Sequence, residues 1–251
     1  MRSIDLNCDM GEAFGSYEIG NDAAIMPYIS SANIACGFHA GDAHVMRKTV
    51  ELALKNEVSI GAHPGLPDLQ GFGRRELAIT PEEAFDYTVY QLGAMQAVAK
   101  SCGTALHHVK AHGALYNMAV RDEALASAIV RAVKSCNHQL VIVGLAGSAW
   151  IKAAKAQGMN YAQEVFADRR YEIDGSLTSR SHADALITDT QEAVEHVERM
   201  VVDGVVETRL GERIPIQADS ICIHGDGEHA IEFAKAIYNR FEQLSIAVRH
   251  F

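Results

Sequence analysis

The sequence predicts an α/β fold in which seven parallel strands form a closed barrel surrounded by helices. Short apolar segments, several of them β-branched, alternate with longer segments of helical periodicity along the 251 residues. A strand followed by a helix, repeated seven times, is typical of parallel strands joined by crossover helices. An open, doubly wound sheet fits the same alternation. The sequence lacks the glycine-rich phosphate fingerprints G-x-G-x-x-G and G-x-x-x-x-G-K-[ST], and this favours the barrel.

The predicted strands are short and mostly apolar, as expected for strands that are buried on both faces of a parallel sheet. We therefore expect apolar residues within the strands and titratable residues only at their ends. The strands are predicted over residues 3–8, 31–36, 58–62, 106–111, 140–144, 162–167 and 219–224.

Helix signals lie between these strands. Asp42 is the expected N-cap of a helix over 42–57. Thr80, Pro81 and Glu83 form an N-cap, a first-turn proline and a capping-box glutamate, which predict a helix over 80–103. Further helices are predicted over 122–136, 148–157, 190–203 and 228–247.

Two segments interrupt the alternation. The Asp-Gly turn in YEIDGSL, near 171–180, and the Gly-Glu turn in VETRLGERIPI, near 205–216, predict small inserted hairpins. No linker-like or low-complexity segment divides the chain. We therefore expect a single barrel domain over residues 1–251.

Composition excludes several classes of protein. The formal net charge is −10 with no basic cluster, which argues against a nucleic acid or an anionic membrane as partner. No segment approaches the roughly 18 apolar residues of a membrane span, and the N-terminus shows no secretory signal. The five cysteines are odd in number and include no C-x-x-C pair. This pattern fits a reducing compartment, so we expect a cytoplasmic protein.

Histidines recur on short, glycine-containing segments that follow predicted strands: CGFHAGD, GAHPG, KAHGA and CIHGDG. Each histidine taken alone is more often a loop or capping residue than a catalyst. The joint pattern is more informative, because the C-terminal ends of barrel strands share one face, where active sites collect. The residues expected to converge there are Asp9, Glu12, His39, His63, His112, Asp168, Arg169 and His224.

The residue types indicate a reaction class. Carboxylates (Asp9, Glu12, Asp226) and imidazoles can move protons at neutral pH. Arg74, Lys110 and Arg169 can hold an anion or stabilise an oxyanion, although Lys110 could also simply extend to the surface. The sequence has no G-x-S-x-G elbow and no catalytic cysteine signature, which favours direct attack by water on a carbonyl-type carbon.

A metal site is a second interpretation of the same residues. One aspartate with two histidines at strand ends is a known type of ligand set. The sequence has no compact H-x-x-x-H or H-E-x-x-H that would place the ligands on one element. A bound divalent metal therefore stays an open alternative.

Long motifs also carry a resemblance. DLNCDMGEAFG, NIACGFHAGD, IGAHPGLPDLQGFGRR, VKAHGALYN, EVFADRRY and CIHGD closely resemble the LamB/YcsF family and extend from residue 5 to 226. The resemblance implies a distorted, TIM-like, seven-stranded barrel similar to the glycoside hydrolase/deacetylase superfamily. The family pattern has proline where this sequence has Ala43 and Ala111. These changes affect the backbone and leave the titratable residues in place.

The resemblance further implies an activity. Together with partner subunits B and C, members of the family act as a 5-oxoprolinase, cleaving 5-oxo-L-proline to L-glutamate at the expense of ATP. ATP with its Mg²⁺ is thus an implied cofactor. Because this chain has no recognisable nucleotide loop, we expect ATP binding to be completed by the partners or to belong to them.

In this reaction Asp9 or His39 would activate water, and His112 or His224 would protonate the departing ring nitrogen. Lys110 and Arg74 would hold the substrate carboxylate or the phosphate. The full expected set comprises catalytic Asp9, Glu12, His39, His112 and His224 with substrate-binding His63, Arg74, Lys110, Asn117, Asp168, Arg169 and Asp226.

Two other functions remain open. The chain could be a stand-alone, metal-dependent hydrolase or deacetylase of a small N-acyl compound. It could also be a non-catalytic component that presents 5-oxoproline to partner enzymes, although the many titratable residues at strand ends argue against this one.

Overall fold

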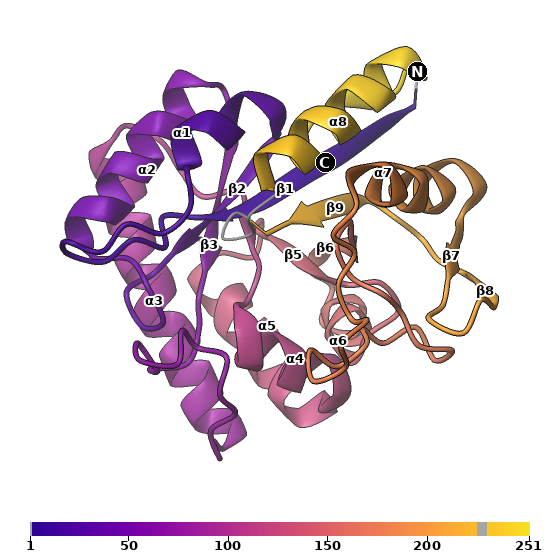
Figure 1. Cartoon of the computed structure of the whole chain (residues 1–251). Coiled ribbons are helices and arrows are strands. Elements are labelled where there is room, and N and C mark those ends of the chain that lie inside the picture. Colours follow the sequence, from indigo (N-terminus) through magenta and orange to yellow (C-terminus); the bar gives the residue numbers. More distant parts are fainter. Residues whose placement is uncertain (1, 225–229) are drawn as a thin grey trace.

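The computed structural model describes residues 2–224 and 230–251 and confirms the barrel (Figure 1). Seven parallel strands pair in the order β1, β2, β3, β4, β5, β6 and β9, and the pairing of β9 with β1 closes the ring. The strands are β1 (Ser3–Met10), β2 (Ser31–Ala35), β3 (Ser59–His63), β4 (His108–Val109), β5 (Val141–Leu145), β6 (Asn160–Phe166) and β9 (Ser220–Ile223).

Helices surround the barrel (Figure 1). Both predicted N-caps are present, because Asp42 accepts the backbone N–H groups of His44 and Val45, and Thr80 and Glu83 form a capping box. The helices are α1 (Asp22–Ile25), the 3₁₀ turn η1 (Met26–Tyr28), α2 (Ala43–Lys55), α3 (Pro81–Ser101), α4 (Gly113–Arg121), α5 (Glu123–Cys136), α6 (Ala149–Ala156), α7 (Thr190–Glu198), its π-helical extension η2 (Arg199–Asp203), and α8 (Ala230–Gln243).

Some predicted boundaries are wrong. Helix α4 was not predicted, and the helix predicted over 228–247 ends at Gln243. The chain then turns at Ser245, which has a φ of 56°, and forms β10 (Ala247–Val248) beside the start of β1. A residue with positive φ cannot continue a right-handed helix, so this turn ends α8.

Two small elements lie beside the barrel. Strands β7 (Val205–Glu207) and β8 (Arg213–Pro215) form a separate antiparallel pair. The 171–177 segment is held by a single bridge between Tyr171 and Leu177, and Tyr171 also bridges to Thr208. The two insertions are therefore neighbours in space.

The interior of the barrel is polar, which contradicts our expectation of apolar residues within the strands. Asp5, Asn7 and Asp9 alternate along β1 and are nearly inaccessible to solvent. The intervening Leu6 and Cys8 belong to the hydrophobic core. The sequence alternation of polar and apolar residues thus separates the barrel interior from the layer packed under the helices.

These interior polar groups are paired with one another. Asp5 accepts hydrogen bonds from Ser30, Ser31 and Ser220, and Asn7 donates to Ser220. One level higher, Asn33 donates to both Asn7 and Asp9, and its own amide oxygen lies 2.9 Å from Nε2 of His108. Buried polar groups are tolerated when they are hydrogen-bonded, and here the partners come from neighbouring strands.

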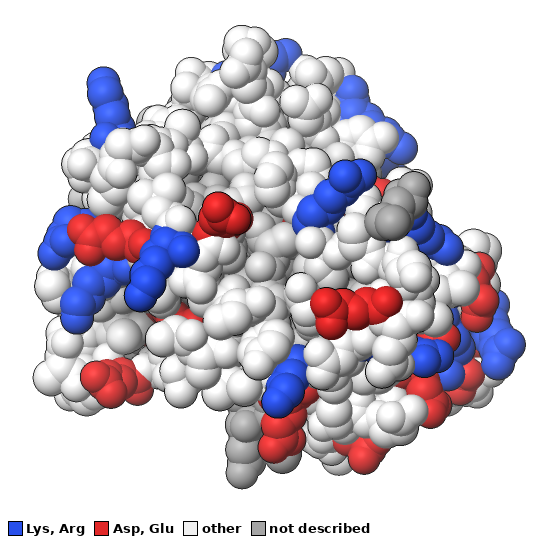
Figure 2. Space-filling view, turned by 90° about the horizontal axis from the view of Figure 1, so that it is seen from above, with Lys and Arg blue, Asp and Glu red and all other residues white. Residues whose placement is uncertain are grey.

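Charged side chains are mixed on the surface. On the face shown in Figure 2, blue and red residues are interspersed around the edge of a largely uncharged centre. Within the described part of the chain, no helix is both long and apolar enough to cross a membrane.

Gly61 in β3 allows the buried imidazole of His108 to lie against the strand. A Cβ at Gly61 would come within 2.1 Å of Nε2 of His108. We expect Gly61→Ala to lower the free energy of unfolding by roughly 1–3 kcal/mol through overpacking. The matched control is Gly93→Ala on an exposed position of α3, where nothing lies within 4 Å and alanine should stabilise by up to ~1 kcal/mol. Urea denaturation measures both, and equal effects at the two sites would contradict this packing.

His196 in α7 predicts a pH dependence of stability. Burial lowers the pKa of His196 from 6.5 to about 4. The unfolded chain therefore binds a proton below pH 6.5 that the folded chain does not bind until about pH 4. Folding should lose up to about 1.4 kcal/mol per pH unit from this residue as the pH falls through that window. Urea denaturation between pH 7.5 and 5 should show a shallower decline for His196→Gln than for the unmodified chain, and parallel declines would refute the assignment.

Candidate functional site

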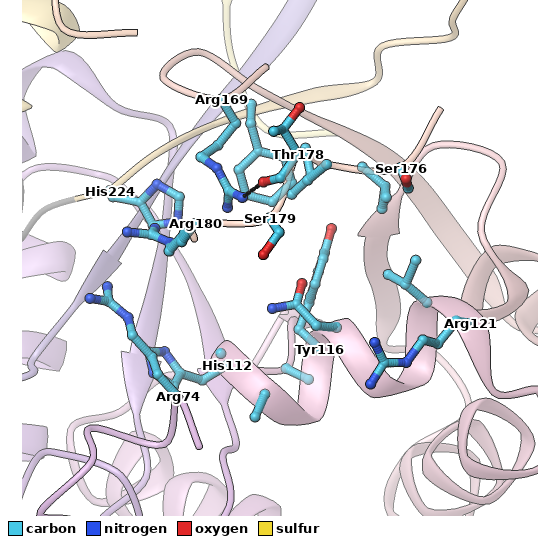
Figure 3. Close-up of a pocket in the computed structure, with 18 of the residues that line it drawn as sticks. Arg74, His112, Tyr116, Arg121, Arg169, Ser176, Thr178, Ser179, Arg180 and His224 are labelled. Atoms are coloured by element: carbon cyan, nitrogen blue, oxygen red, sulfur yellow. Dashed lines mark hydrogen bonds between the residues drawn. The ribbon is translucent and has the colours of Figure 1, made fainter. Parts of the chain in front are cut away.

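A cavity of about 500 Å³ opens at the C-terminal ends of the barrel strands. Its wall includes Asp9 from β1, Phe166 from β6 and His224 just after β9. Figure 3 shows helix α4, with Tyr116 and Arg121, on the side of the cavity that faces Arg74 and His224. The chain from Ser176 to Arg180 closes a further side. The cavity thus has the position that active sites take in β/α barrels.

A buried lysine lies at the floor of this cavity. Nζ of Lys110 is 2.9 Å from Oδ1 of Asp9, 2.8 Å from Oε1 of Glu164 and 2.9 Å from Sγ of Cys222. Only 2% of the Lys110 side chain is exposed, so it does not extend to the surface. Burial alone would lower the pKa of Lys110, but the charges of Asp9, Cys222 and Glu164 raise it well above its usual value. Lys110 is therefore a fixed cation.

Asp9 is a fixed anion. Burial would raise the pKa of Asp9, but His63 and Lys110 together lower it well below its ordinary value. Its Oδ1 accepts hydrogen bonds from Lys110 and Asn33, and its Oδ2 lies 3.3 Å from Nε2 of His63. A carboxylate with so low a pKa is a weak proton acceptor and acts mainly through its charge.

Three imidazoles and one carboxylate form a compact cluster beside Asp9. The rings of His39 and His112 stack 3.7 Å apart, and the ring of His63 is nearly perpendicular to both. Glu12 Oε1 is 3.3 Å from Nε2 of His39 and 3.3 Å from Nδ1 of His112. Burial, together with neighbouring imidazoles, lowers the pKa of His39 and of His112 well below 6.5. Both rings are therefore neutral at pH 7.

This cluster has the composition of a metal-ligand set. Glu12, His39, His63 and His112 each contribute one ligand atom, and these atoms lie within 4.8 Å of one another. A second group with the same property consists of Asp9, Cys222 and His224. Imidazole and carboxylate donors suit a divalent transition ion.

The opposite side of the cavity is cationic. Arg74, Arg169 and Arg180 all line it and surround one region of Figure 3. Arg169 is 6% exposed, and its Nη2 donates to the carbonyl of Thr178 at 2.7 Å, whereas its Nε has no hydrogen-bond partner in the described structure. Burial and the charge of Arg180 lower the pKa of Arg169. A guanidinium this buried favours an anionic ligand.

His224 is oriented by a carboxylate. Its Nδ1 lies 2.8 Å from Oδ2 of Asp168, which leaves Nε2 for contacts in the cavity. Burial would raise the pKa of Asp168, but His224 and Arg169 lower it. A carboxylate that fixes the ring of a histidine is a common arrangement for proton transfer.

The structure brings most of the expected residues together. Asp9, Arg74, Lys110, His112, Asn117, Arg169 and His224 line the cavity, and Asp168 contacts it through His224. Glu12, His39 and His63 lie behind His112, and His39 is completely buried. His39 therefore cannot activate a water molecule in the cavity. Asp226 lies outside the described residues.

Several site residues were not predicted. Glu164 is fully buried and bonded to Asn7, Lys110 and Tyr116. The signal for Glu164 and Asn7 was present as single polar residues at alternate positions of otherwise apolar strands. Arg180 and Ser179 had no comparable signal, because they lie in a loop without regular periodicity.

The fold and the site together define a class of protein. A parallel β/α barrel with imidazoles, carboxylates and arginines around a strand-end cavity is typical of proteins that bind or transform small molecules. The chain belongs to the LamB/YcsF family, whose model matches residues 4–251.

Named relatives agree with this family. The chain is 58% identical to the A subunit of 5-oxoprolinase from Shouchella clausii, over 99% of this chain and 98% of that protein. It is 44% identical to a lactam utilization protein from Thermus thermophilus, whose crystal structure gives a TM-score of 0.94 over 99% of this chain and 100% of that one. A T48 deacetylase shares only the fold, at 11% identity and a TM-score of 0.52, over 99% of this chain and 88% of that one.

Removing the buried cation should cost stability. Lys110→Met leaves Asp9 and Glu164 without their shared partner, and breaking a buried ion pair typically costs about 3–5 kcal/mol. The control is Arg47→Met on α2, which breaks an exposed pair with Glu51 and should cost no more than about 0.5 kcal/mol. Urea denaturation at pH 7 measures both. A loss below ~1 kcal/mol for Lys110→Met would show that the two carboxylates do not depend on this lysine.

Proposed function

We propose that this chain is the component of an ATP-dependent 5-oxoprolinase that binds 5-oxo-L-proline and carries out its hydrolytic ring opening to L-glutamate, together with partner subunits B and C. The observation that carries the proposal is the division of the cavity into two sides. One side presents fixed arginines, and the other presents Asp9 and the His224–Asp168 pair. The names of full-length relatives support the choice of substrate.

A small anionic lactam suits this division. The carboxylate of 5-oxoproline, or a phosphoryl group on the lactam oxygen, would face Arg169, Arg180 and Arg74. The lactam carbon would then lie toward Asp9 and His224. Asn117 on α4 lines the same cavity and can donate a hydrogen bond to the substrate.

The proton transfers are assigned to His224. We infer that its Nε2 accepts a proton from water as the water oxygen bonds to the lactam carbon. The same proton then passes to the ring nitrogen as the carbon–nitrogen bond breaks. Asp168 holds the imidazole in place, and Asp9 orients the water by charge rather than by taking its proton.

ATP enters through the leaving group. A lactam is a poorly electrophilic amide, and phosphorylating its oxygen would make the carbon open to water and release phosphate afterwards. The arginine side of the cavity can hold such a phosphoryl group. We assign nucleotide binding, with its Mg²⁺, to the complex with subunits B and C. We also assign the reaction to the cytoplasm, in keeping with the five free cysteines.

A stand-alone, metal-dependent hydrolase is the second candidate. The compact cluster of Glu12, His39, His63 and His112 favours it. The two functions differ in their requirement for partners. A pure single chain that opens a lactam or an N-acyl compound without ATP would support the second candidate and contradict the first.

The proposal predicts separate effects for His224 and Asp9. His224→Gln should lower the rate of ATP-dependent glutamate release by the reconstituted complex by at least ~100-fold, the usual effect of losing a general acid–base group. Its thermal midpoint should change little, because His224 is partly exposed. Asp9→Asn should lose activity to a similar extent and also lower the midpoint, because Asp9 is buried in an ion pair with Lys110 rather than placed at a solvent-facing turn.

The control for both variants is Asp42→Asn, which keeps the N-cap of α2 because asparagine caps as well as aspartate. Its activity and midpoint should stay near those of the unmodified chain. The single chain without partners should release negligible glutamate. Near-normal turnover by His224→Gln would remove this residue from the mechanism.

A further inference from the structure

We propose that Glu12, His39, His63 and His112 form a binding site for one divalent first-row transition ion such as Zn²⁺. The site lies behind the wall of the cavity and reaches it through His112. The inference goes beyond the proposed reaction, since it concerns only side chains of this chain and requires neither the substrate nor a partner.

Hydrogen bonds to backbone carbonyls determine where two of the imidazoles carry their protons. Nδ1 of His63 lies 2.7 Å from the carbonyl oxygen of Lys110. Nε2 of His112 lies 2.7 Å from the carbonyl oxygen of Phe72. A carbonyl oxygen can only accept, so each of these nitrogens must carry a hydrogen. The other nitrogen of each neutral ring then presents a lone pair.

Those two lone pairs face each other. Nε2 of His63 and Nδ1 of His112 are only 3.0 Å apart. Two acceptors at this distance repel unless something positive lies between or beside them. Further acceptors surround the same point, because Glu12 Oε1 lies 3.3 Å from Nδ1 of His112 and Asp9 Oδ2 lies 3.3 Å from Nε2 of His63. Such a concentration of electron pairs favours a cation.

The spacing of the donor atoms suits a small transition ion. Around a tetrahedral ion with metal–ligand bonds of about 2.1 Å, neighbouring ligand atoms lie roughly 3.4 Å apart. The corresponding distances here are 3.0 Å from His63 to His112, and 3.3 Å from Glu12 to both His112 and His39. Three imidazoles with one carboxylate favour zinc or a similar ion over Ca²⁺, which prefers oxygen ligands.

The ligands are held in place from behind. Metal-binding histidines usually donate their second N–H to a carbonyl or carboxylate, as His63 and His112 do here. Two glycines allow the chain to pack directly on the rings. A Cβ at Gly73 would come within 2.6 Å of Cβ of His39 and 2.9 Å of Cδ2 of His112, and one at Gly65 within 2.5 Å of Nδ1 of His39. The cluster is therefore preorganised rather than assembled by a flexible surface.

The competing explanation is a single proton shared between His63 and His112. Titration of chelator-treated single chain with Zn²⁺ and Mn²⁺, by calorimetry and by elemental analysis after dialysis, distinguishes the two. The site predicts one bound ion per chain and a raised thermal midpoint. An absence of stoichiometric binding, with no change in midpoint, would overturn the proposal and leave the shared proton.

Variants locate the ion. Glu12→Gln and His112→Gln should each weaken affinity by more than the ~10–100-fold that loss of an outer-shell partner costs. His196→Gln, a buried histidine outside the cluster, should bind as the unmodified chain does. Cys222→Ser tests the other candidate group, Asp9, Cys222 and His224. Loss of binding in Cys222→Ser, with unchanged affinity in Glu12→Gln and His112→Gln, would overturn the assignment. Midpoints measured without metal show that each variant is folded.

Discussion

The buried cation of Lys110 is the constraint on which the arrangement of the barrel depends. Its partners come from different strands: Asp9 from β1, Glu164 from β6 and Cys222 from β9. An isolated charge in a protein interior is strongly unfavourable, so the lysine and the two carboxylates can be buried only together. The closed ring of parallel strands makes this possible, because it directs side chains from opposite strands toward one axis. Outside the ring, the helices cover a conventional apolar layer (Figure 1).

The same constraint shapes the chemistry at the strand ends. With its charge held by Lys110, Asp9 stays an anion next to the imidazoles of His63 and His112. These imidazoles are positioned by backbone carbonyls rather than by water. The arginines lie on the opposite side of the cavity, on loops that follow the strands. The result is a cavity with an anionic and neutral floor and a cationic rim, in which a small anion can take only a limited set of orientations.

The fold by itself does not assign the reaction. A deacetylase with 11% identity shares the barrel, whereas the relatives named for 5-oxoproline and lactam use share the whole sequence. The difference between these proteins must therefore lie in the side chains at the strand ends. In this chain the His224–Asp168 pair and the buried Arg169 give those ends a distinct chemistry. The histidine cluster behind them is separate from both, since His39 does not reach the cavity.

By itself, the sequence determined the alternation of strands and helices, the caps at Asp42 and Thr80, and the placement of Asp9, His112 and His224 at one end of the barrel. These features depend on local periodicity, capping and the rule that parallel strands end on one face. Only the tertiary structure decided which side chains meet. Lys110 and Glu164 are 54 positions apart, and their 2.8 Å contact arises from the closure and stagger of the ring. Burial likewise decided the charge of each group, since a pKa depends on neighbours that no local pattern specifies.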